Sequence, residues 1–165
     1  MFNIPAVQLL QIHAANGNKN GRLYQYLFSR KPPITFFQGF PDWFTQPAHA
    51  VELMFQFSNQ YMNQTVADEN LSRKLIKYWT NFAKSGDVNG PDLPLWPKYD
   101  TSTRYYINLD ANITTGQHFI KDRVTFWLED IPNMAGATSD SNSVYRLSVV
   151  QGVFIFCYFM LQVFL

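Results

Sequence analysis

Histidine is the side chain that most readily exchanges protons near neutral pH, and this chain has three, His13, His49 and His118. His49 stands between two alanines in a loop after Pro47, and Glu52 follows three residues later. A histidine so placed is suited to general acid and base catalysis, in which it removes a proton from a nucleophile and returns one to a leaving group. A loop histidine taken alone is nevertheless more often structural. We interpret His13 and His118 as structural, because one falls in a short opening helix and the other near a helix start.

The composition argues against several other kinds of site. The net charge is +1 and the basic residues are scattered, so no electrostatic footprint for nucleic acid is present. The only cysteine, Cys157, lies in an apolar segment and cannot form an internal disulfide. No metal site and no cofactor are predicted. The 15 Phe, 9 Tyr and 4 Trp residues indicate a piece of a large, well-buried core.

Hydrophobic spacing and turn residues predict three helices and two strands. The helices are expected over residues 7–15, 65–85 and 118–129, and the strands over residues 22–28 and 104–109. Helices that alternate with strands indicate an α/β protein, but two strands are too few for a sheet covered on both faces. We therefore expect an incomplete sheet with flanking helices, which would be the C-terminal part of a larger domain.

The helix over residues 65–85 has the clearest boundaries. Thr65 and Asp68 match a capping box, and Gly86 is suited to the left-handed conformation that ends a helix. Between them, apolar residues recur at helical spacing: Leu71, Leu75, Trp79 and Phe82. This helix is therefore expected to bury one face.

The helix over residues 118–129 is expected to stop at Pro132, because proline lacks an amide hydrogen and clashes with the preceding turn. Its apolar residues fall roughly on one side: Phe119, Val124, Trp127 and Ile131. Four large aromatic residues of the chain are assigned to the core: Trp79, Phe82, Trp96 and Trp127.

Residues 149–165 form a nearly unbroken apolar run, preceded by a polar spacer over residues 133–148. At about 1.5 Å of rise per helical residue, this run with its flank approaches the roughly 30 Å hydrocarbon core of a bilayer. Small residues, a spacer and a terminal apolar tail are the parts of a glycosylphosphatidylinositol attachment signal, with Ser139 and Ser141 as candidate sites. A retained membrane-spanning helix and a buried core helix are the alternatives.

Three glycosylation sequons begin at Asn63, Asn70 and Asn112. Together with the apolar tail, they predict a glycoprotein on the extracellular face of the plasma membrane, reached through the secretory pathway. Residues 1–5 have neither a basic region nor an apolar stretch, so they do not form a signal peptide. We therefore expect that upstream sequence exists and that residues 1–132 are the C-terminal portion of a larger domain.

Several motifs resemble the C-terminal region of the type-B carboxylesterase and cholinesterase-like family. The segment YWTNFAKSGD, the triplet NGP and the segment LWPKY carry this resemblance, at residues 78–87, 89–91 and 95–99. The segment VTFW at residues 124–127 resembles the Phe-Trp helix that closes the family's domain. Residues 41–55 resemble the segment that carries its catalytic histidine, usually His-Gly-Asp-Glu-Leu. The resemblance extends from Phe2 to Ile131.

This resemblance implies an α/β-hydrolase fold and cleavage of carboxylic esters by acyl transfer. It identifies His49 with the triad histidine, which follows the nucleophilic serine and the acid in chain order. The 165 residues contain no Gly-x-Ser-x-Gly, so we expect the chain alone to be inactive. Glu52 lies too near His49 to be the triad acid, which comes from a separate loop, and a local hydrogen-bonding role is expected. At Ala50 and Val51 the chain departs from the family's Gly-Asp.

The resemblance leaves an alternative function open, because neuroligin-like adhesion proteins use the same fold without catalysis. Residues 79–87 and 126–129 resemble neuroligins, and Val124 stands where cholinesterases have a cysteine. The expected partners are a small ester substrate if the protein is an enzyme, and the membrane through the tail. A homodimer through the helix over residues 118–129 is an alternative to burial of that helix in the core.

Overall fold

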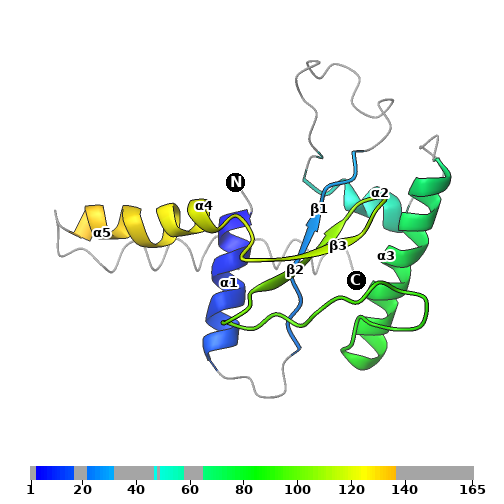
Figure 1. The fold of residues 1–165 in the computed structure, drawn as a ribbon, viewed down its shortest axis with the longest axis horizontal. Coiled ribbons are helices and arrows are strands. Elements are labelled where there is room, and N and C mark those ends of the chain that lie inside the picture. The colour runs from blue at the N-terminus through cyan, green and yellow to red at the C-terminus, as the bar shows by residue number, and fades with distance from the viewer. Residues whose placement is uncertain (1–2, 17–21, 32–46, 48, 58–64, 137–165) are drawn as a thin grey trace, which may run out of the picture. The chain divides into compact units, whose positions relative to one another are not determined.

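The computed structural model of the chain describes residues 3–16, 22–31, 47, 49–57 and 65–136 (Figure 1). In chain order the elements are α1 (Asn3–Ala15), β1 (Tyr26–Phe28), α2 (Glu52–Phe57), α3 (Val66–Ser85), β2 (Tyr105–Leu109), β3 (Thr114–Gln117), α4 (Lys121–Thr125), the π-helical turn η2 (Phe126–Asp130) and α5 (Ile131–Gly136). The chain divides into two compact units, residues 18–119 and residues 1–17 with 120–165. The apolar tail lies outside the described residues, among which no helix is long and apolar enough to cross a membrane.

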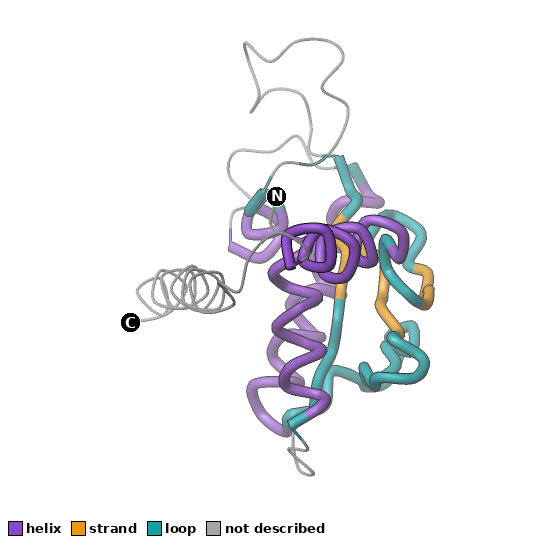
Figure 2. Tube along the Cα trace, turned by 90° about the vertical axis from the view of Figure 1, so that its left-hand side faces the viewer, coloured by secondary structure: helices purple, strands orange, loops and turns teal. Residues whose placement is uncertain are grey.

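The first unit, residues 18–119, contains a three-stranded sheet in the order β1-β2-β3. β1 pairs with β2 in parallel, with Tyr26 opposite Ile107, and β2 pairs with β3 in antiparallel. The strands are short beside the helices, as Figure 2 shows. The parallel pair and the flanking helices confirm the expected α/β class. β3 was not predicted from the sequence, because its residues, Thr114–Gln117, include no apolar side chain.

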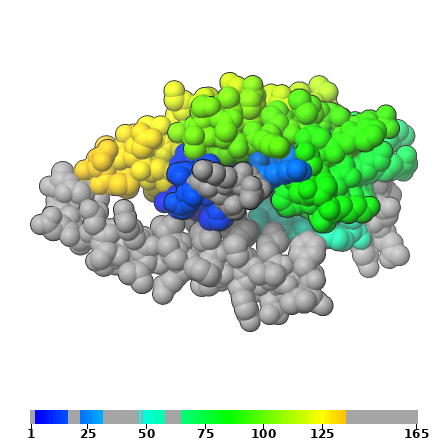
Figure 3. Space-filling view, turned by 90° about the horizontal axis from the view of Figure 1, so that it is seen from below, coloured from blue at the N-terminus to red at the C-terminus, as the bar shows by residue number. Residues whose placement is uncertain are grey.

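The core of this unit lies where α3 packs against α2 and the sheet. Its fully buried members come from all these elements: Phe55, Leu71, Leu75, Tyr78, Ile107 and Leu109. Burial of such a side chain contributes about 1.5–3 kcal/mol, so this cluster dominates the stability of the unit. On the face drawn in Figure 3, green atoms of α3 and of the chain after it lie beside blue atoms of the segment that contains β1.

The predicted boundaries of α3 are confirmed. The Thr65 hydroxyl accepts the Asp68 N–H at 3.2 Å, and the Asp68 carboxylate accepts the Thr65 N–H at 2.9 Å, which completes a capping box. At the other end Gly86 has a φ of 70°, and its N–H donates to the Phe82 carbonyl at 2.7 Å.

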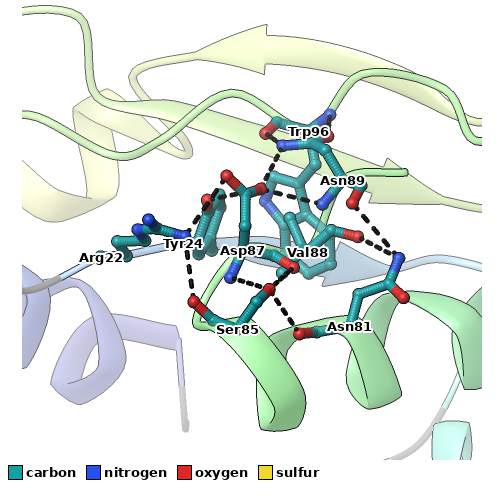
Figure 4. Close-up of polar contacts among 8 residues, drawn as sticks. All are labelled: Arg22, Tyr24, Asn81, Ser85, Asp87, Val88, Asn89 and Trp96. Carbon is teal, nitrogen blue, oxygen red and sulfur yellow. Dashed lines mark hydrogen bonds and ion pairs between the residues drawn. The ribbon is translucent and has the colours of Figure 1, made fainter. Parts of the chain in front are cut away.

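Side-chain amides organise the segment after α3, which carries the family-like NGP motif (Figure 4). Asn89 is central: its Nδ2 donates to the Trp96 carbonyl at 3.0 Å, and its Oδ1 accepts the Trp96 N–H at 2.8 Å. The Tyr24 hydroxyl and the Asn89 amide both donate to Asp87 Oδ1. The segment has no regular secondary structure, so side chains such as Asn89 and Asp87 supply the hydrogen bonds that a helix or strand would otherwise make.

The core assignment of the aromatic residues is partly wrong. Trp96 is buried and Trp79 packs on the core, as predicted. Phe82, however, is 46% exposed near the end of α3, and Trp127 is 54% exposed on η2. Periodicity places both residues on an apolar face, but helical spacing alone does not specify how far the packing partner extends along that face.

The boundaries of the last helix also differ from the prediction. It begins at Lys121 rather than His118, because His118 and Ile120 both adopt left-handed backbone angles with positive φ. It then passes through Pro132, where it was expected to end. The Ile131 N–H donates to Phe126 five residues back, and this π-helical turn shifts the hydrogen-bond pattern just before the residue that lacks a donor.

Two further boundaries are corrected. Helix α1 begins at Asn3 rather than Val7. The strand expected over residues 22–28 is confined to Tyr26–Phe28, and ahead of it the Leu23 carbonyl accepts the Tyr99 N–H at 2.8 Å instead of a strand partner. The residues ahead of β1 therefore make backbone hydrogen bonds, but these bonds are not part of the β-sheet.

Candidate functional site

His49 lies in a turn over residues 49–51 that leads directly into α2. Its side chain is exposed, and the chain reaches this turn after β1, the strand that pairs in parallel with β2. In α/β sheets, binding sites form outside the carboxyl ends of parallel strands, and the segments that follow such strands carry the functional residues. The catalytic role of His49 stays a prediction.

The turn that carries His49 depends on a left-handed residue. Ala50 has a φ of 65°, a conformation that glycine adopts without cost and that alanine adopts with strain. The Ala50 carbonyl accepts the Leu53 N–H at 3.2 Å, and the Val51 carbonyl accepts the Met54 N–H at 3.1 Å. Alanine at this position therefore strains the turn.

Glu52, the first residue of α2, is held by β1. The Tyr26 hydroxyl donates to Glu52 Oε1 at 3.3 Å, which agrees with the local role expected for this carboxylate. Burial raises the pKa of Tyr26 far above its usual value, and the Glu52 carboxylate raises it further. The phenol therefore remains protonated and able to donate across the physiological pH range.

A second contact fixes the other end of α2. The Ser72 hydroxyl donates to the Phe55 carbonyl, and the Phe55 ring packs on Phe28 with their centroids 5.1 Å apart. The helix after the histidine turn is thus attached to β1 at two points and to α3 at one. Sequence reasoning missed α2 itself, because its six residues are too few to display a helical period.

A partly buried ion pair joins the segment after β1 to α3. Arg30 Nε lies 2.6 Å from Asp68 Oδ1 and its Nη1 lies 3.6 Å from Asp110 Oδ1. Burial alone would raise the pKa of Asp68, but hydrogen bonds from Arg30 and Thr65 outweigh burial and lower it. The sequence signalled only the capping role of Asp68. Because its oxygens are occupied by Arg30 and Thr65, we assign it a structural function.

The remaining candidate residues do not gather around His49. His13 is exposed in the last turn of α1 and His118 is exposed ahead of α4. Asn70 is exposed on α3, and Asn112 is exposed in the turn between β2 and β3. Asn63, Ser139 and Ser141 lie outside the described residues. Within the described part of the chain, no group of three or more acidic, histidine or cysteine side chains is arranged to hold a metal ion.

Comparison with known proteins identifies the family of the chain. Residues 1–127 match the Carboxylesterase family, so the chain belongs to that family. Mouse Carboxylesterase 5A is 35% identical over 92% of this chain, and the human Carboxylesterase 5A is 34% identical over 94% of it. Chicken Acetylcholinesterase is 31% identical over 78% of this chain. The chain spans 28% of the length of each Carboxylesterase 5A and 17% of the acetylcholinesterase.

Membership of this family confirms the resemblance to type-B carboxylesterases and implies an α/β-hydrolase fold, of which the described sheet and helices are a part. The relatives named above are esterases. The neuroligin-like alternative gains no support from them.

Proposed function

We propose that this chain supplies the catalytic histidine, His49, of a carboxylic ester hydrolase. The observation that carries the proposal is the position of His49 on a left-handed turn ahead of α2 in a chain of the carboxylesterase family. The 165 residues contain no Gly-x-Ser-x-Gly. In this proposal the nucleophilic serine and the triad acid therefore belong to sequence outside these residues, and the 165-residue chain alone does not hydrolyse esters.

The proposed chemistry is acyl transfer in two steps. The His49 imidazole removes the proton of the serine hydroxyl as the serine oxygen attacks the ester carbonyl, and it then gives that proton to the departing alcohol. In the second step the imidazole removes a proton from water as the water oxygen attacks the acyl-enzyme carbonyl. It then gives that proton to the serine oxygen as the acyl–serine bond breaks and the carboxylic acid is released. Exposure of His49 supports this role, because the imidazole must reach both substrate and water.

The test is an esterase chimera, in which the intact 165-residue chain replaces the matching part of mouse Carboxylesterase 5A. Hydrolysis of p-nitrophenyl acetate is measured for His49→Gln and, as a matched control, for His118→Gln, another exposed histidine. His49→Gln is expected to lower kcat at least about a thousandfold, while His118→Gln leaves it unchanged. An active His49→Gln chimera would overturn the proposal.

The proposed location is the extracellular face of the plasma membrane, with a lipid anchor at Ser139 or Ser141. The apolar run over residues 149–165 and the exposure of Asn70 and Asn112 support it. In cells that express the chain behind a secretion signal, a phospholipase specific for phosphatidylinositol is expected to release it. Protein that stays on the membrane after the phospholipase would indicate a retained span instead.

The glycosylation sites are tested in the same cells. Asn70→Gln and Asn112→Gln are each expected to lower the apparent mass on a gel by one glycan.

A homodimer through the helix over residues 118–129 completes the proposal. Phe126 and Trp127 are exposed, and large exposed aromatic residues are typical of interfaces. Sedimentation of the chimera is expected to give a dimer, which Trp127→Glu converts to a monomer. The control is Val66→Glu, which changes a still more exposed apolar residue on α3. A dimer that survives Trp127→Glu would exclude this surface.

A further inference from the structure

The Tyr26 side chain is 38% exposed, and the rest of its ring packs on two tryptophans. Its ring meets Trp79 edge to face at a centroid distance of 5.3 Å and Trp96 at 6.1 Å. Trp96 is itself immobilised, because it is buried and its indole Nε1 donates to the Gln25 carbonyl at 3.1 Å. The hydroxyl at the end of this packed ring therefore has a defined position, from which it donates to Glu52 Oε1 at 3.3 Å.

Because Glu52 is next to the turn that carries His49, a contact that holds Glu52 also restrains the turn. Glu52 is the residue at which the turn over residues 49–51 becomes α2, and it is only three residues from His49. Val51, the last residue of the turn, is only 3% exposed and belongs to the core, and backbone hydrogen bonds run from Leu53 and Met54 to Ala50 and Val51. The positive φ of Ala50 is strained, and this strain favours a change in the backbone conformation of the turn. A contact that holds Glu52 therefore limits the backbone conformations that residues 49–51 can adopt.

We propose that Tyr26 is a positioning residue for His49, acting through its hydrogen bond to Glu52. The inference rests on the proposed function, because it names a residue that supports the same site. Catalytic groups must be held within a fraction of an ångström, and a displacement of about 1 Å can cost a hundredfold in rate. The hydroxyl is the part of Tyr26 that matters, because phenylalanine would keep the ring contacts and lose only the donor.

The kinetic test uses the esterase chimera with Tyr26→Phe. The matched control is Tyr24→Phe, which removes a hydroxyl that donates to Asp87 at 3.2 Å in the segment after α3 (Figure 4). Tyr26→Phe is expected to lower kcat about tenfold with KM unchanged, and Tyr24→Phe to leave both constants unchanged. Equal kcat values for Tyr26→Phe and the parent chimera would overturn the inference.

Substitutions of Glu52 separate positioning from general stability. Glu52→Gln keeps an acceptor oxygen for the phenol and is expected to lose less than about threefold in kcat, whereas Glu52→Leu is expected to lose about tenfold. The double variant Tyr26→Phe with Glu52→Leu should be no slower than either single variant, because both remove the same contact. Additive losses would show that the two residues act separately and would overturn the inference.

A measurement on the 165-residue chain itself keeps the inference distinct from the proposed function. Tyr26→Phe is expected to speed hydrogen exchange of the Leu53 and Met54 amides at least about threefold and to leave the α3 amides unchanged. If His49→Gln remains active while this exchange increases, the proposed function fails and the positioning contact stands. If His49→Gln is inactive and the exchange is unchanged by Tyr26→Phe, the positioning inference fails alone.

Discussion

The Arg30 Nε lies 2.6 Å from Asp68 Oδ1, and the Asp68 side chain is only 2% exposed. The same carboxylate accepts hydrogen bonds from the Thr65 N–H at 2.9 Å and from the Thr65 hydroxyl at 2.7 Å. One buried side chain thus caps α3 and joins it to Arg30, which lies two residues after the end of β1. An ionised carboxylate is required for both tasks.

Asp68→Asn is expected to destabilise the chain by about 2 kcal/mol at pH 7, since it weakens a charge-assisted hydrogen bond and a capping box together. The loss should depend on pH. Because hydrogen bonds lower the pKa of Asp68 in the folded chain below 3.8, its ionised form adds stability above about pH 4. This contribution disappears as the pH falls through the folded-state pKa. Urea unfolding at several pH values measures it.

Glu69→Gln is the control for this pair. Glu69 is the neighbouring acid in the first turn of α3, and it makes only an exposed i,i+4 pair with Arg73 at 3.2 Å. Its substitution is expected to change the free energy of unfolding by less than about 0.5 kcal/mol. A stability difference between Asp68→Asn and the parent chain that persists undiminished at pH 2 would contradict the role of the charge.

Ala50→Gly is expected to stabilise the chain by about 0.5–1 kcal/mol. Alanine at a φ of 65° costs about 1–2 kcal/mol, whereas glycine adopts this conformation freely and loses part of the gain through the entropy of the unfolded chain. Urea unfolding measures the difference.

The control has the opposite expected sign. Ala83 is exposed on α3, so Ala83→Gly should destabilise by about 1 kcal/mol through helix propensity alone. If both glycine substitutions destabilise by the same amount, the left-handed turn at Ala50 is not present in solution.

The elements that could be predicted from the sequence are those with local signals. Thr65, Asp68 and Gly86 mark the two ends of α3 because caps are formed by residues close in sequence. Tyr105–Leu109 could be predicted as a strand because its apolar residues alternate. Structure that depends on distant partners could not be predicted in this way, and β3, with no apolar residue, is the clearest case.

For the candidate site, the sequence could point to His49 only through the family resemblance. The contacts that surround its turn join residues far apart in the chain, such as Tyr26 with Glu52 and Ser72 with Phe55. The left-handed angle at Ala50 was also hidden, because alanine, unlike glycine, is not a signal for positive φ. Only the departure from the family's glycine hinted at it.

Trp96→Phe is expected to destabilise the chain by about 2–3 kcal/mol, through the cavity left by the smaller ring and the lost hydrogen bond to Gln25. The loss is limited because the Gln25 carbonyl also accepts the Ile107 N–H at 3.0 Å. Trp127→Phe, at an exposed position, is the control and should change stability by less than about 0.5 kcal/mol. Equal effects in urea unfolding would contradict the different burial of the two residues.

Gly90→Ala is expected to destabilise the chain by about 1–2 kcal/mol because of Asn81. A Cβ at residue 90 would lie 2.8 Å from Asn81 Nδ2, which donates to the carbonyls of Val88 at 3.2 Å and Asn89 at 3.3 Å. The amide must therefore move and weaken both hydrogen bonds (Figure 4). Urea unfolding of the single variants gives the separate costs.

The double variant isolates the steric cause. In an Asn81→Ala background the obstructing amide is gone, so Gly90→Ala should be neutral or stabilise by up to about 0.5 kcal/mol, since alanine restricts the unfolded chain. The resulting coupling energy between the two positions is expected to exceed about 1 kcal/mol. If the two substitutions prove additive, the requirement for glycine at residue 90 comes from the backbone and not from Asn81.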